Sequence, residues 1–88
     1  MTATKPCISE WFDQGVKQGA THLLIVCDTF DHDDYPVFAN GDEDALAQHD
    51  AHDGKNMQRV VEVYDLREDK DAQLHLHRVM RLPRRPNP

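Results

Sequence analysis

Hydrophobic positions in the first twenty residues recur with the period of a helix. Between residues 6 and 18, Ile8, Phe12 and Val16 follow one another at four-residue spacing. This spacing places them along one stripe of an amphipathic helix. Gly19 supplies a natural C-terminal stop, so the pattern predicts an N-terminal helix that ends there.

The next segment has the pattern of a strand that is covered on both faces. The run from Leu23 to Cys27 is continuously apolar and rich in β-formers. Residues 31–34 interrupt it with acidic turn residues, and residues 35–39 resume with aromatic and β-branched side chains. The two runs predict a hairpin around an acidic turn. Pro36 cannot donate to a strand ladder, which places the second strand at a sheet edge.

The second half of the chain predicts a short helix followed by two more strands. Asp42 is in position to cap a short helix before Gly54, with acids in its first turn. Residues 57–66 also fit one face of a helix, but their β-branched and aromatic residues favour a strand by propensity, so a strand is predicted. The charged residues 67–71 indicate a turn. Residues 74–82 then alternate at period two, which predicts a fourth strand. Its apolar side would hold Leu74, Leu76, Met80 and Leu82, and its polar side His75, His77, Val79 and Arg81.

These elements define an α+β domain in the order α-β-β-(α)-β-β. We expect an antiparallel sheet with the N-terminal helix packed on one face and the other face left available. Residues 1–82 form the predicted domain, and residues 83–88 form a Pro- and Arg-rich flexible tail.

Charge is distributed unevenly along the chain. The 88 residues carry a formal charge of -6, yet residues 28–53 hold nine acids and no Lys or Arg. The basic end, with Arg78, Arg81, Arg84 and Arg85, is too small a patch for a nucleic-acid binder, so nucleic acid is an unlikely partner. No segment has the length of a membrane helix or the apolar stretch of a signal peptide, which predicts a soluble, cytoplasmic protein without membrane contact.

Three segments carry a resemblance to known sequences. They run from Gly19 to Asp31, from Asp34 to Phe38 and from Met57 to Asp65. Together they resemble a set of short bacterial and phage-borne proteins of unknown function. The resemblance implies a compact fold and a bacterial or phage setting, and it transfers no catalytic or binding residue.

Two side-chain clusters are candidate metal sites. Residues 28–34 offer five possible ligands but lack the alternating spacing, the Gly and the terminal Glu of a calcium loop, which favours an exposed turn. The second cluster consists of two histidine pairs, and two such pairs that met would suit Zn²⁺. The pairs are His49 with His52, and His75 with His77.

An enzyme is not predicted. Asp28 and Asp31 with His32 as general base would suit a hydrolase, but the chain has no Gly-rich phosphate loop and little volume for a substrate pocket. Cys27 has apolar and acidic neighbours, which raise a thiol pKa and blunt its reactivity.

The leading hypothesis is therefore a small acidic, non-enzymatic interaction or regulatory module without a cofactor. Its acidic middle would contact a protein partner or a second copy of the chain through charge complementarity. The alternative is a divalent-metal-binding protein that uses the histidine pairs or the loop from Asp28 to Asp34. The predicted partner-binding residues are Asp28, Asp31, Asp33, Asp34, Asp42, Glu43 and Asp44.

Overall fold

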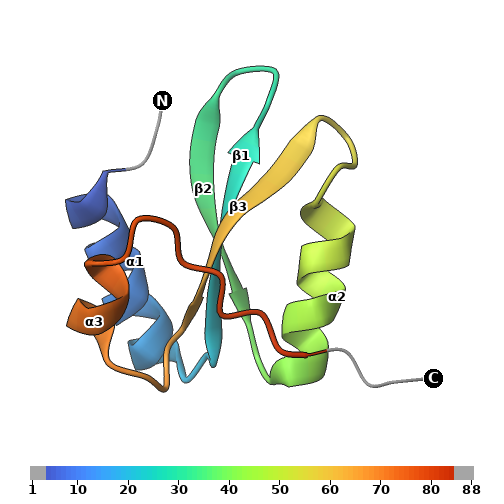
Figure 1. Cartoon of the computed structure of the whole chain (residues 1–88). Helices are drawn as coiled ribbons and strands as arrows, with labels where there is room; N and C mark the ends of the chain where they lie inside the picture. The colour runs from blue at the N-terminus through green and yellow to red at the C-terminus, as the bar shows by residue number, and fades with distance from the viewer. Residues whose placement is uncertain (1–3, 85–88) are drawn as a thin grey trace.

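A computed structural model describes residues 4–84 and confirms the α+β class (Figure 1). A three-stranded antiparallel sheet in the order β2-β1-β3 separates helices α1 and α3 from helix α2. No helix within residues 4–84 has the length and apolar character needed to cross a bilayer. In chain order the elements are α1 (Lys5–Gln18), β1 (His22–Asp28), β2 (Asp33–Ala39), α2 (Asp42–His52), β3 (Gln58–Asp65) and α3 (Lys70–Leu74).

Helix α1 begins and ends as its sequence predicts. Pro6 lies in the first turn, where a missing N–H is not needed, and Gly19 ends the helix with φ 81°. Gly15 is required for a different reason. A Cβ atom there would lie 2.5 Å from Cδ1 of Leu66 and 3.0 Å from the ring of Phe38, so the helix backbone approaches the sheet closely.

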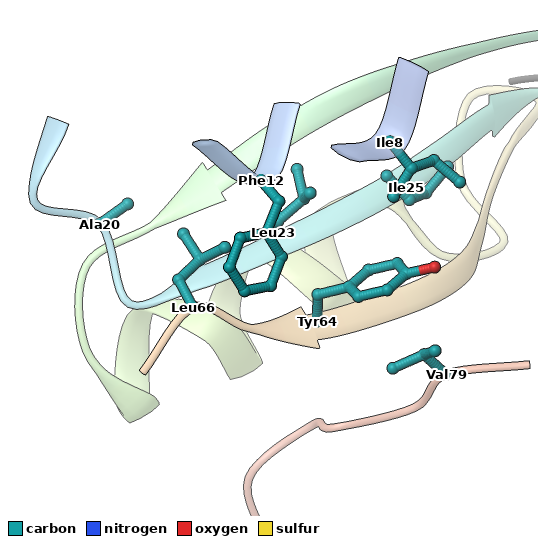
Figure 2. Close-up of a cluster of buried hydrophobic side chains, with 8 residues drawn as sticks. All are labelled: Ile8, Phe12, Ala20, Leu23, Ile25, Tyr64, Leu66 and Val79. Carbon is teal, nitrogen blue, oxygen red and sulfur yellow. The ribbon is translucent and has the colours of Figure 1, made fainter. Parts of the chain in front are cut away.

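Strand β1 is buried on both faces because its side chains alternate between two apolar clusters. Leu23 and Ile25 join the cluster drawn in Figure 2, which also holds Ile8 and Phe12 of α1 and Tyr64 of β3. The rings of Phe12 and Tyr64 meet edge to face with centroids 6.4 Å apart. The predicted doubly covered strand is thus confirmed.

The second cluster lies between the sheet and α2. It contains Leu24 and Val26 of β1, Val60 and Val63 of β3, and Ala45 of α2. Strands β2 and β3 lie on opposite sides of β1, and both run antiparallel to it. The chain therefore crosses from one sheet edge to the other through α2, which makes a split β-α-β unit. The expectation of one uncovered sheet face is therefore wrong over the length of α2.

Two details of the predicted hairpin and second helix have different outcomes. Pro36 does lie in the edge strand β2, opposite Ile25 of β1. Asp42 does not cap α2: Gly41 is the N-cap residue, and it makes no side-chain cap hydrogen bond. Asp42 is instead the first residue of the helix, where its carboxylate still suits the helix dipole.

The predicted fourth strand over residues 74–82 is wrong. Residues 70–74 form α3, because the Asp69 carboxylate accepts a hydrogen bond of 2.8 Å from the Ala72 N–H and caps a helix within the charged segment. Within residues 4–84, the later segment pairs its backbone with β3 through one isolated parallel bridge, Met80 to Val63, and not through a strand ladder. Val79 is fully buried there while Met80 is exposed, which reverses the predicted faces.

The β1–β2 hairpin extends past the helices at one end of the molecule (Figure 1). We call this the hairpin end. It comprises residues 28–34 and residues 53–59, and the two segments are joined because the Thr29 N–H and hydroxyl both donate to the Met57 carbonyl, at 2.7 and 2.8 Å. Residues 85–88 of the predicted tail lie outside the described residues.

Candidate interaction surface at the hairpin end

The seven acidic residues predicted to bind a partner do not form one surface. Residues 28–34 turn between β1 and β2 at the hairpin end, whereas residues 42–44 begin α2, after β2 has run to the opposite end of the sheet. The structure brings Asp28, Asp31, Asp33 and Asp34 together and separates them from Asp42, Glu43 and Asp44. The candidate surface is therefore limited to the hairpin end.

The acids at the start of α2 serve the fold. Asp42 Oδ1 lies 3.0 Å from Nη2 of Arg67, and the same guanidinium makes two bonds of 3.0 Å to the carboxylate of Asp65. Burial alone would raise the pKa of Asp65, but the side-chain and backbone hydrogen bonds from Arg67 hold it below its usual range. Asp44 accepts a bond of 2.8 Å from the Asn40 N–H. Glu43 is exposed.

The turn at the hairpin end is built on Asp28. Its Oδ1 accepts from the backbone N–H groups of Phe30 at 2.9 Å and Asp31 at 3.3 Å, which is the pattern of an Asx turn. His32 follows with φ 59° in the left-handed region. These bonds give Asp28 a structural role and leave the Phe30 side chain outside the fold. Asp31 makes no side-chain hydrogen bond or ion pair within residues 4–84.

Two large apolar side chains are exposed at the hairpin end. Phe30 is 69% exposed and Met57 is 57% exposed, and they come from the two loops that Thr29 joins. Asn56 and Met57 both have positive φ, at 53° and 60°, although neither is glycine. Strained backbone that is held by its surroundings is a feature of functional segments. Aromatic residues and Met are also enriched in protein interfaces.

A hollow of about 410 Å³ opens on the α1 face of the sheet next to this turn. Ile8 and Ile25, which lie together in Figure 2, belong both to the buried cluster and to the hollow, so the core reaches the surface here. The residues that line it are Ile8, Ile25, Cys27, Asp34, Arg59, Val61, Glu62, His77 and Arg78.

The charged residues of the hollow fall into two groups. Glu62 accepts from the Tyr64 hydroxyl and the Val79 N–H, and Nε of Arg78 donates to the Val61 carbonyl, so these two side chains fix the C-terminal segment. Within residues 4–84, neither the guanidinium of Arg59 nor the ring of His77 takes part in a hydrogen bond or ion pair. The Arg59 guanidinium and the His77 ring therefore remain available for contact with a partner at the rim of the hollow.

The thiol in the hollow is not set up as a nucleophile. Burial raises the pKa of Cys27, and the neighbouring Asp34 carboxylate raises it further. Sγ lies 3.7 Å from the Asp28 carbonyl oxygen, to which the thiol donates. Because the thiolate is the nucleophilic form, a raised pKa lowers the reactivity of this thiol.

The two histidine pairs lie on opposite faces of the sheet. His49 and His52 belong to α2, and His52 Nδ1 lies 2.8 Å from the Gln48 carbonyl oxygen. His75 follows α3 as its C-cap, and His77 lines the hollow on the other face. Within residues 4–84 no group of three His, Cys, Asp or Glu side chains is placed to hold a metal ion.

Sequence reasoning missed the apolar half of the surface. Phe30 stands between acidic residues in a turn, which is a signal that an aromatic side chain has no core position. Arg59 and Met57 gave no such signal, since each lies at the boundary of a segment that was assigned to a strand. Their position at the hairpin end depends on the α2 crossover. No family model, curated protein or solved structure matches the chain.

Proposed function

We propose that the protein is a small non-enzymatic interaction module whose hairpin end binds a protein partner. The observation that carries this proposal is the exposure of Phe30, at 69%, beside a hollow whose floor continues the hydrophobic core. Exposed aromatic side chains beside apolar depressions are typical of the central residues of protein interfaces.

Charge supports a partner with basic as well as apolar side chains. Residues 28–34 include four acids and no Lys or Arg, so they present negative charge around Phe30. A carboxylate rim around an aromatic side chain favours a partner whose basic groups surround an apolar pocket. The Cys27 thiol and the engaged Glu62 and Arg78 side chains favour binding over catalysis at the same place.

The test is affinity capture by the immobilised protein, with a variant of the hairpin end compared against a matched control. In the variant, Phe30→Ser is combined with Met57→Ser; in the control, Val16→Ser changes an exposed apolar residue near the end of α1, at the opposite end of the molecule. We expect the same captured proteins with wild type and control, a loss of at least one of them with the variant, and weaker capture as salt rises. Equal capture by wild type and variant would contradict the proposal.

A further inference from the structure

The hollow and the Phe30 side chain lie at the same end of the molecule and have complementary chemistry. We infer that the partner is a second copy of this chain, with Phe30 of each copy seated in the hollow of the other. This inference rests on the proposed function, because it names the occupant of the same surface.

The apolar lining of the hollow suits a large apolar side chain. We call the Phe30 side chain, which is proposed to enter it, the knob. The floor of the hollow is formed by Ile8, Ile25 and Val61, and it continues the buried cluster into solvent. A large apolar side chain placed there removes both its own surface and the floor from water. Phe30 has the highest exposed fraction of the large hydrophobic residues within residues 4–84.

One charged residue beside Phe30 and one at the rim of the hollow are opposite in sign, although Asp34 and Glu62 also line the hollow. Asp31 follows Phe30 directly and has no side-chain partner within residues 4–84. Arg59 stands at the rim of the hollow, also without a hydrogen bond or ion pair, and His77 lies at the same rim. Seating Phe30 brings the Asp31 carboxylate toward a guanidinium that has no hydrogen bond or ion pair with residues 4–84.

The placement of both features at one end gives a closed assembly. When a knob and its hollow share a surface patch, a two-fold axis lets each copy use both at once, which makes an isologous dimer. The β1–β2 hairpin extends past the helices there, which leaves its turn exposed to a second copy (Figure 1).

The test is the molar mass of the full chain by light scattering, measured as a function of concentration up to about 1 mM and of salt. We expect twice the monomer mass at low salt and a shift toward the monomer as salt rises. Asp31→Lys and Arg59→Glu should each weaken the dimer about tenfold or more, and the double variant should restore it because the pair is reversed. Glu10→Lys and Lys17→Glu change exposed charges on α1 and should leave the mass unchanged.

Mixing two variants gives a second, independent readout. Phe30→Ser removes the knob but keeps the hollow, whereas Arg59→Glu weakens the hollow but keeps the knob. Each variant alone should be monomeric at a concentration where wild type is dimeric. Their mixture should regain a mixed dimer, because one intact knob still finds one intact hollow.

A monomer at every concentration and salt would overturn the inference. A dimer that the Phe30→Ser, Asp31→Lys and Arg59→Glu variants all leave intact would also overturn it, since the contact would then lie elsewhere. Either result leaves the proposed function standing if the hairpin-end variant still loses a captured protein. Loss of capture without any self-association would therefore identify a different partner at the same surface.

Discussion

Nε2 of His22 lies 3.8 Å from Oδ1 of Asp42 and hydrogen-bonds to no atom of residues 4–84, although the side chain is fully buried. The other ring nitrogen, Nδ1, lies 2.8 Å from the Thr21 hydroxyl oxygen. Asp65 Oδ2 lies 4.0 Å from Nε2, and Arg67 binds both carboxylates. A buried imidazole is thus enclosed beside two carboxylates that share a single guanidinium, that of Arg67.

This relationship predicts that the fold loses stability in mild acid. Burial lowers the pKa of His22 below 6.5, and Arg67 lowers it further, while Asp65, Asp42 and Glu68 act in the opposite direction. Below pH 6.5 the unfolded chain binds a proton that folded His22 resists, so the free energy of unfolding falls as pH drops from 6.5 toward the lowered value. The slope disappears once the pH is below the pKa of the folded state.

Urea unfolding followed by Trp11 fluorescence at several pH values between 5 and 8 measures this effect. His22→Phe should flatten the pH dependence in that window, since it removes the ring whose pKa folding lowers. His75→Gln is the matched control because His75 is exposed, and it should keep the wild-type slope. An unfolding free energy of wild type that rises below pH 6.5 would show that the carboxylates outweigh burial.

The hydrogen bonds of Gln73 predict a second effect on stability. Gln73 belongs to α3, which lies where the sequence predicted a fourth strand. This buried amide accepts from the Asp65 N–H at 2.9 Å and donates to the Asp65 carbonyl at 2.8 Å, so it replaces a strand partner at the end of β3. Gln73→Leu would leave both backbone groups buried and unpaired. We expect a loss of about 2–4 kcal/mol in the free energy of unfolding, measured with urea. Gln14→Leu, on the exposed side of α1, should change it by less than about 0.5 kcal/mol.

The part of the fold that the sequence could predict is the part that local pattern decides. The continuously apolar run from Leu23 to Cys27 predicted a strand covered on both faces. Pro36 predicted that the next strand lies at the edge of the sheet. The segment from Leu74 to Leu82 was wrongly predicted as a strand because its apolar and polar residues alternate in the sequence without forming a strand. Its structure depends on the Asp69 cap and on the distant pairing of Gln73 with Asp65. The Asp69 cap is a local signal, whereas the pairing of Gln73 with Asp65 depends on where β3 ends.

The candidate surface was predictable only in its acidic half. The carboxylates of residues 28–34 are consecutive in sequence, and the turn that gathers them is local. Arg59 and His77 reach the hollow because α2 crosses the sheet and because the C-terminal segment returns along β3. Neither event is encoded within a short window of residues. The two histidine pairs each share a face only within their own segment. Whether the pairs meet depends on the tertiary structure, which their local spacing does not predict.

Metal addition provides a direct check on the histidine pairs. His49 and His52 lie in α2, and His77 lies on the opposite face of the sheet, so a shared ion would require the fold to open. We expect the melting temperature to be the same with stoichiometric Zn²⁺, Mn²⁺ or Ca²⁺ and with EDTA. A ligand at one hundred times its dissociation constant adds about 2.7 kcal/mol, which shifts the melting temperature of a small domain by several degrees. A rise of that size with one metal would reinstate the metal-binding hypothesis.

Gly15 predicts a loss of stability where helix propensity alone predicts a gain. Alanine is better than glycine in a helix interior by about 1 kcal/mol, yet here its Cβ would lie 2.5 Å from Cδ1 of buried Leu66. Overpacking of this kind costs about 1–3 kcal/mol, so Gly15→Ala should lower the free energy of unfolding by about 1 kcal/mol net. Leu66→Val removes a methylene at the contact, and the double variant should therefore be more stable than the sum of the two single changes predicts. Strict additivity in this cycle, measured by urea unfolding, would mean that α1 and the end of β3 do not approach as closely as described.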